Sequence, residues 1–269
     1  MEIFSHLSVD KRNGPLCNIS LPHNVLVMAS KILLGVVIFI AAGCTKEPSS
    51  VPDTLAMQEI TKAGLIEKEH FDILTKGVLH EGDGITVAEY FWYGCNHCFD
   101  MEPIVREWKA AMPQNSKILR IPVVWRNDMI LHGKAYYAGE SLVRDGKLSS
   151  SNWEALHYSM FLTIMGFTAQ TSPDEQRKTL QKHFERFGVS KDDFDRALDS
   201  EETDSKLTIA RSWQKKSKID GTPTFIVDGV YRINKDNLAM KEDLIVRGNR
   251  LIRAIKKAKR QHKSERTEA

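Results

Sequence analysis

The chain has 269 residues, of which 42% are hydrophobic, so it is long enough to bury a core as one large domain or a domain with an insertion. The net charge of +3 is local, because the first 43 residues carry +1 and residues 256–269 carry +4, which leaves about −2 for the segment between them. This distribution lacks the basic footprint of a nucleic-acid-binding protein and argues against nucleic acid as a partner.

The N-terminus has the features of an export signal. Residues 32–42 (ILLGVVIFIAA) form an uncharged run that follows Lys31 and is too short for a comfortable membrane span. The small residues before Cys44 resemble the lipobox of bacterial lipoproteins, in which that cysteine is lipidated, although Ala41 stands where leucine is usual. An uncleaved anchor is the alternative, and Met28 is a natural start for the signal. Both alternatives predict that the rest of the chain is exported.

The cysteine count agrees with export of a redox protein. With Cys17 in the leader (residues 1–43) and Cys44 at the lipidation site, the exported body retains only Cys95 and Cys98. A chain without a structural disulfide in an oxidising compartment, yet with one such pair, is more readily explained as handling disulfides than as being stabilised by them.

The segment before the redox pair predicts a tether and the first strands. Residues 44–69 comprise a polar, proline-containing tether and a short helix over Leu55–Glu69. Phe71–Leu79 favours a first strand and residues 80–84 a turn. The β-branched and aromatic run Ile85–Trp92 predicts a buried central strand, which Gly94 ends.

Cys95 and Cys98 are separated by two residues between that strand and a helix predicted over Met101–Met112, which contains Pro103 and ends before Pro113. A thiol at a helix N-terminus meets unpaired N–H groups and the positive end of the helix dipole, which favour the reactive thiolate. Cys95 is therefore predicted to attack and Cys98 to resolve. The alternative is half of a zinc site, but the only other cysteines lie upstream of the body, so we expect no metal.

The rest of the chain completes an α/β pattern. Lys117–Trp125 predicts a third strand, parallel to the central one in a βαβ unit. Residues 129–204 are helical, with a capping box at Ser172–Glu175 and another helix start at Ser190. A helix over Ser205–Lys218, two short strands at 224–227 and 230–233, and a final amphipathic helix follow.

This order predicts a thioredoxin-like α/β fold with an inserted helical domain. The thioredoxin-like part is assigned to residues 70–128 and 205–256 and the helical insertion to residues 129–204. Residues 257–269 form a basic tail, interpreted as a solvated helix end, with weak attraction to anionic lipid as the alternative.

Pro223, within Gly221-Thr222-Pro223-Thr224-Phe225, stands at the start of a predicted core strand. An isolated X-Pro is most often an ordinary edge-strand or turn proline. The cysteine pair upstream favours a cis-proline that faces the two thiols, with Thr222 presenting backbone groups to an extended substrate peptide.

Residues 89–98 (EYFWYGCNHC), Pro103 and residues 221–231 (GTPTFIVDGVY) resemble the DsbA family of thiol:disulfide oxidoreductases, and the resemblance extends from about Phe71 to Lys256. It implies an exported enzyme of the bacterial periplasm or cell envelope that passes its Cys95–Cys98 disulfide to reduced secreted proteins. It also implies that no cofactor other than this disulfide is needed, and that a membrane quinone-linked oxidase of the DsbB type re-oxidises the pair.

Two further residues are candidates for the site. His97, just before Cys98, is expected to hydrogen-bond or place positive charge beside the Cys95 thiolate, and a solvent-facing histidine is the alternative. Glu89 is a carboxylate in an apolar strand. If it is buried and isolated, its pKa is raised and it can shuttle the proton of Cys98, whereas a solvent-facing Glu89 would have no such role.

The direction of electron flow has two alternatives. Asn96 replaces the proline of the best-known oxidases, and threonine before Pro223 is common in the disulfide-isomerase branch. An oxidase is favoured over an isomerase or reductase, because the segment before Phe71 is short for a dimerisation module. A non-catalytic peptide-binding lipoprotein is a third alternative, which would not need the two thiols.

Overall fold

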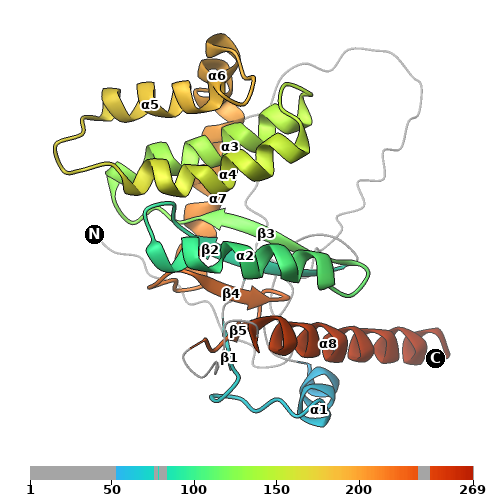
Figure 1. Ribbon diagram of the computed structural model, residues 1–269. Helices are drawn as coiled ribbons and strands as arrows, with labels where there is room; N and C mark the ends of the chain where they lie inside the picture. Colours follow the sequence, from blue (N-terminus) through green and yellow to red (C-terminus); the bar gives the residue numbers. More distant parts are fainter. Residues whose placement is uncertain (1–52, 76–77, 79–83, 236–242, 269) are drawn as a thin grey trace, which may run out of the picture. The chain divides into compact units, whose positions relative to one another are not determined.

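The computed structural model describes residues 53–75, 78, 84–235 and 243–268 (Figure 1). The leader, Cys17, Cys44 and the tether prediction lie outside this range. No helix of the described residues is both long enough and apolar enough to cross a membrane. The elements in chain order are α1 (Thr54–Lys62), β1 (Phe71–Ile73), β2 (Ile85–Phe91), α2 (Asn96–Ala111), β3 (Ser116–Pro122), a 3-10 turn η1 (Asn127–Met129), α3 (Ile130–Arg144), α4 (Ser150–Met165), α5 (Pro173–Glu185), α6 (Lys191–Leu198), α7 (Glu201–Lys216), β4 (Thr224–Val227), β5 (Tyr231–Ile233) and α8 (Asp243–Glu268).

The five strands form one mixed sheet in the order β1-β5-β4-β2-β3. β2 and β3 run parallel, as the βαβ pattern predicts, and β4 is antiparallel to β2 with Tyr90 opposite Thr224. Every residue of β2 is buried, which explains why its sequence is apolar or aromatic except at Thr86 and Glu89. The carboxyl end of β2 and the start of β4 therefore lie side by side in the sheet.

Two hydrophobic clusters lie on opposite faces of the sheet. Side chains of α1, α2 and α8 pack against one face, where Trp108 of α2 is fully buried. Ala88 and Tyr90 of β2 belong to the second cluster, which is shared with α3, α4, α5, α6 and α7. These helices lie together in Figure 1, with α2 and the sheet between them and α8.

The structure confirms the thioredoxin-like α/β fold with a helical insertion and changes several bounds. α1 ends at Lys62, followed by Gly64 with a φ of 74°, so the expected helix to Glu69 is wrong. β1 ends at Ile73. β3 ends at Pro122, which has no N–H for the ladder, and not at Trp125. α2 begins at Asn96, five residues before the expected start.

Two of the domain boundaries predicted from the sequence do not coincide with the ends of helices in the structure. The proposed boundary after residue 204 falls inside α7, which begins at Glu201 after the N-cap Ser200. Residues 257–268 are the last part of α8 and most of them are exposed, in agreement with their interpretation as a solvated helix end, although they are not a unit separate from that helix. The capping box at Ser172 is present with both of its hydrogen bonds, and Ser190 caps α6 as expected.

Candidate functional site

Cys95 is the N-cap residue of α2. Its backbone is extended, with φ −102° and ψ 112°, and its sulfur accepts a hydrogen bond from the backbone N–H of Cys98 at 3.3 Å. The Cys95 side chain is half-buried, whereas Cys98 is fully buried one turn into the helix. The two thiols are free in this structure.

The loop before β4 meets Cys95 from the other side. The Thr222–Pro223 peptide bond is cis, as the motif predicts, and Sγ of Cys95 lies 3.5 Å from the Thr222 carbonyl oxygen. Residues 127 positions apart in sequence meet here because β4 pairs directly with β2.

The two cysteines have opposite acidities. A hydrogen bond from the Cys98 thiol lowers the pKa of Cys95 to about 5, outweighing the effect of burial, and Thr222 and the backbone N–H groups of Cys98 and His97 add to it. Burial raises the pKa of Cys98 far above the ordinary thiol value, and its bond to the Cys95 sulfur raises it further. Cys95 is thus a thiolate at neutral pH while Cys98 holds its proton.

The His97 side chain is exposed, and its contribution to Cys95 comes through its backbone N–H. The expected side-chain hydrogen bond to the thiolate is therefore not the arrangement described. The sequence predicted that His97 lies at the turn beside Cys95, but it could not show whether the backbone N–H or the imidazole of His97 contacts the sulfur.

Glu89 is fully buried on the face of β2 that α2 covers. The sequence suggested an isolated carboxylate, but in the structure Glu89 has a charged partner. Its Oε2 accepts from Arg120 Nε at 3.2 Å, and Arg120 Nη2 also donates to Glu102 Oε2 of α2 at 2.8 Å. Neither cysteine is a hydrogen-bond partner of Glu89 among the described residues, and its Oε1, also buried, has no partner there.

One buried cation is thus shared between two buried carboxylates. Burial raises the pKa of Glu89 to about 8, and Arg120 only partly opposes this. Burial acts in the same sense on Glu102, but a hydrogen bond from His157 and the charge of Arg120 bring its pKa below the usual value. The pair therefore has one ionised member, Glu102, and one protonated member, Glu89.

The cluster continues to the active-site turn. Burial lowers the pKa of His157, so its ring is neutral and donates from Nε2 to Glu102 Oε1 at 3.3 Å. Its Nδ1 accepts a hydrogen bond from the hydroxyl of Tyr93 at 2.6 Å, and Tyr93 is two residues before Cys95 in the chain. A chain of buried polar contacts therefore runs from Glu89 to the turn that carries Cys95.

Sequence reasoning missed Arg120, Glu102, His157 and Tyr93. Two signals were available, namely a lone arginine in the apolar strand KILRIPVVW and a glutamate one helical turn after Cys98. No cluster of three or more histidine, cysteine or acidic side chains suited to a metal occurs in the described part of the chain.

The chain is similar to curated thiol:disulfide interchange proteins named DsbA. It is 30% identical to that of Burkholderia cepacia over 148 residues, which are 55% of this chain and 65% of the relative, so the match spans slightly less than two thirds of that protein. It is 28% identical to that of Pseudomonas syringae pv. tomato over 168 residues, 62% of this chain and 73% of the relative. These relatives support a DsbA-family thiol:disulfide interchange protein. No protein-family model matches the chain.

Solved structures of DsbA proteins share the fold of this chain. The oxidoreductase NmDsbA1 from N. meningitidis aligns with a TM-score of 0.60 at 21% identity and covers 74% of this chain and 97% of its own. DsbA from Xylella fastidiosa aligns with a TM-score of 0.59 at 22% identity, covering 70% and 96%. At these identities the likeness extends to the fold alone.

Proposed function

We propose that this protein is an exported thiol:disulfide oxidoreductase that introduces disulfides into reduced secreted proteins. The observation that carries the proposal is a half-buried Cys95 at the start of α2, with its pKa lowered to about 5, against the cis-Pro223 loop and beside a buried, protonated Cys98. The names of the curated relatives support the same chemistry.

The reaction has two exchange steps. A substrate thiolate attacks Sγ of Cys95 in the oxidised pair, which forms a mixed disulfide and breaks the Cys95–Cys98 bond. Cys98 leaves as a thiolate and takes up a proton. A second substrate thiolate then attacks the substrate sulfur of the mixed disulfide and releases Cys95, whose low pKa makes it a good leaving group.

Glu89 is proposed to supply and remove the proton of Cys98. Its carboxyl is protonated near neutral pH, and its Oε1, which has no hydrogen-bond partner among the described residues, leaves one oxygen available for exchange. Because no direct contact joins it to Cys98, the transfer requires an intervening water. His97 is proposed to stabilise the Cys95 thiolate through its backbone N–H, with added charge when its exposed ring is protonated.

Substrate binding is proposed at the Thr222–Pro223 loop, where an extended peptide pairs with the backbone of Thr222 beside Cys95. The proposed partner for re-oxidation is a DsbB-like, quinone-linked membrane oxidase, and the proposed location is the bacterial periplasm, with the chain anchored through a lipidated Cys44. Loss of lipid labelling in Cys44→Ser, with the chain released from membranes, is the expected result. Unchanged labelling would contradict the anchor.

A reductase or isomerase is the second candidate, favoured by Asn96 between the cysteines and by Thr222 before the cis-proline. The reduction potential of the Cys95–Cys98 pair in glutathione buffers separates the two. A value near about −120 mV indicates an oxidase, and one near about −270 mV a reductase. Absence of any redox couple, with Cys95→Ser behaving as the unaltered chain, would exclude both.

A further inference from the structure

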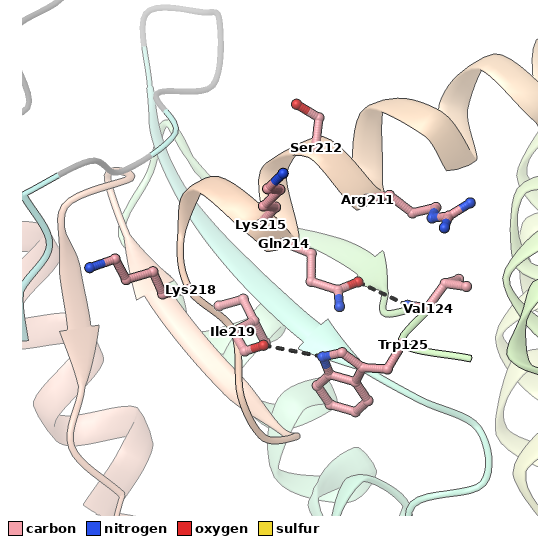
Figure 2. Close-up of a pocket in the computed structure, with 8 residues that line it drawn as sticks. All are labelled: Val124, Trp125, Arg211, Ser212, Gln214, Lys215, Lys218 and Ile219. Atoms are coloured by element: carbon pink, nitrogen blue, oxygen red, sulfur yellow. Dashed lines mark hydrogen bonds between the residues drawn. The ribbon is translucent and has the colours of Figure 1, made fainter. Parts of the chain in front are cut away.

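A groove of about 620 Å³ lies between the C-terminal part of α7, the segment that follows β3 and the segment that leads to the Thr222–Pro223 loop (Figure 2). Two hydrogen bonds build its floor. The side chain of Gln214 accepts from the Val124 N–H at 2.9 Å, and the Trp125 ring N–H donates to the Ile219 carbonyl at 3.2 Å. Trp125 is nevertheless 43% exposed, which is unusual for so large a side chain.

The groove is lined by three cations, Arg211, Lys215 and Lys218. All three are exposed, and none forms an ion pair with an acidic side chain of the described residues, whereas Arg177, Lys191 and Lys206 of the neighbouring helices do. Figure 2 shows Arg211 and Lys218 extending to opposite sides of the Gln214–Val124 contact. Asp220 is the nearest acidic residue in sequence and does not line the groove.

The groove adjoins the proposed active site by two routes. Ile219 is three residues before Thr222, whose carbonyl oxygen lies 3.5 Å from Sγ of Cys95, and three residues span at most about 11 Å. Arg126, the residue after Trp125, lies with its guanidinium 5.6 Å from the ring of Trp92, which packs beneath Gly94 next to Cys95. An extended chain rises about 3.3 Å per residue, so a substrate held at Cys95 reaches the groove about three residues from its reacting cysteine.

We propose that this groove binds an acidic segment of the substrate polypeptide, about three to six residues from the cysteine that reacts with Cys95. The three cations pair with carboxylates and the face of Trp125 receives an apolar neighbour. The inference rests on the proposed function and adds to it a substrate preference, because cations without an acidic partner among the described residues, in a groove that also exposes an aromatic ring, complement an acidic strand and not a basic one.

The test uses the full chain and dithiol peptides that carry three glutamates within this range on one side of the first cysteine, with glutamine-matched versions. We expect the oxidised chain to react about tenfold faster with the acidic peptides, as three exposed ion pairs would give. The ratio of the reaction rate with the acidic peptides to the rate with the glutamine-matched peptides should approach one in the variant Arg211→Gln/Lys215→Gln/Lys218→Gln. It should persist in Arg253→Gln/Arg260→Gln/Lys263→Gln, which removes the same charge from exposed positions of α8. Lys215→Glu/Lys218→Glu should prefer lysine-containing peptides.

Binding is measured separately with labelled peptides whose cysteines are replaced by serine, so that the groove is tested without redox chemistry. One outcome is that the acidic peptide binds more tightly through the three cations but that no dithiol peptide is oxidised. This outcome supports the proposed binding groove and contradicts the proposed function. Oxidation of both peptides at equal rates and with equal binding overturns the groove alone. Binding of phosphatidylglycerol vesicles through these cations, with no peptide preference, also overturns it.

Discussion

Cys95 and Cys98 are three residues apart, yet one thiol is acidic and the other holds its proton. Their different burial and the direction of the hydrogen bond between them account for this, because Cys98 donates and Cys95 accepts. The acidity of Cys95 therefore depends on Cys98 as much as on the start of α2.

Titration of the Cys95 thiolate tests this dependence. In the reduced chain, the ultraviolet absorbance of the thiolate should reach half of its maximum near pH 5. Replacement of Cys98 by alanine removes the largest lowering contribution, and a hydrogen bond to a charged group corresponds to a shift of about 1–2 pH units upward. His97→Ala keeps its backbone N–H, so it should move the midpoint less. An equal midpoint in Cys98→Ala and the unaltered chain would contradict the assignment.

Glu89 should make the stability of the oxidised chain depend on pH. Its pKa is raised in the folded state, so its contribution is fully present below the unfolded value of about 4.5 and is lost as pH rises through about 8. Between pH 7 and 8 the unfolding free energy should fall by about 1 kcal/mol from this group, and Glu89→Gln should remove the slope. Chemical denaturation at several pH values measures it. Glu107→Gln, an exposed site on α2, should keep the slope, and a slope retained in Glu89→Gln would refute the assignment.

Among the elements, α8 packs against α2 at one close contact. A Cβ atom added to Gly248 would lie 2.0 Å from the Trp108 ring, and Asn249 beside it accepts from the Trp108 ring N–H at 3.0 Å. The same Asn249 donates to the carbonyl of Ala111 at the end of α2. The helix that begins after Cys95 is thus held to α8 by its far end.

Gly248→Ala should therefore destabilise the fold, although alanine is the better helix former. The gain in helix propensity is about 1 kcal/mol, but the clash with buried Trp108 requires the two helices to separate, and overpacking costs about 1–3 kcal/mol, which leaves a net loss of up to about 2 kcal/mol. Denaturant unfolding measures the difference. Val246→Ala, at an exposed site of the same helix, should change stability by less than about 0.5 kcal/mol. Equal stability of Gly248→Ala and the unaltered chain would show that the helices adjust freely.

At the scale of the whole molecule, the insertion and the sheet are joined through the buried polar cluster. His157 of α4 contacts Glu102 of α2 and Tyr93 of the active-site turn, so three parts of the fold meet at one imidazole. The surrounding rings of Phe91, Tyr136 and Phe161 lie 5.6–5.8 Å from it, between centroids. The helical insertion therefore supports the turn that holds Cys95.

The difference in unfolding free energy between the reduced and the oxidised chain should depend on pH through the Cys95 thiolate. Its pKa is lowered in the folded reduced form, so the stabilisation is fully present above the ordinary thiol pKa and is lost as pH falls through about 5. The unfolding free energy of the reduced chain relative to the oxidised chain should fall by about 1–3 kcal/mol from pH 7 to pH 4. Paired denaturation curves measure this difference. A difference independent of pH, or one retained in reduced Cys95→Ser, would be inconsistent with a thiolate origin.

The sequence by itself determined the chemistry and the order of the elements. The pair Cys95–Cys98 after an apolar strand, the proline at position 223 and the helix signals between them depend on local spacing and on backbone preferences. These are short-range properties, so they predicted the βαβ unit, the helical insertion and the cis-proline before the structure. The ends of α1, β3 and α2 were wrong by several residues because competing local signals decide where an element ends.

Only the tertiary structure decided which polar groups meet. Arg120 faces Glu89 because parallel pairing of β2 and β3 sets those two residues opposite each other. His157 reaches Glu102 from a position 55 residues further along the chain, and the hydrogen bonds of Gln214 and Ile219 that build the groove join residues 90 and 94 positions apart. Burial then changes the pKa of each group by an amount that no local pattern records, because desolvation depends on everything packed around it. The cysteines could thus be read from the sequence, whereas their acidities and the surface beside them depend on the packed fold.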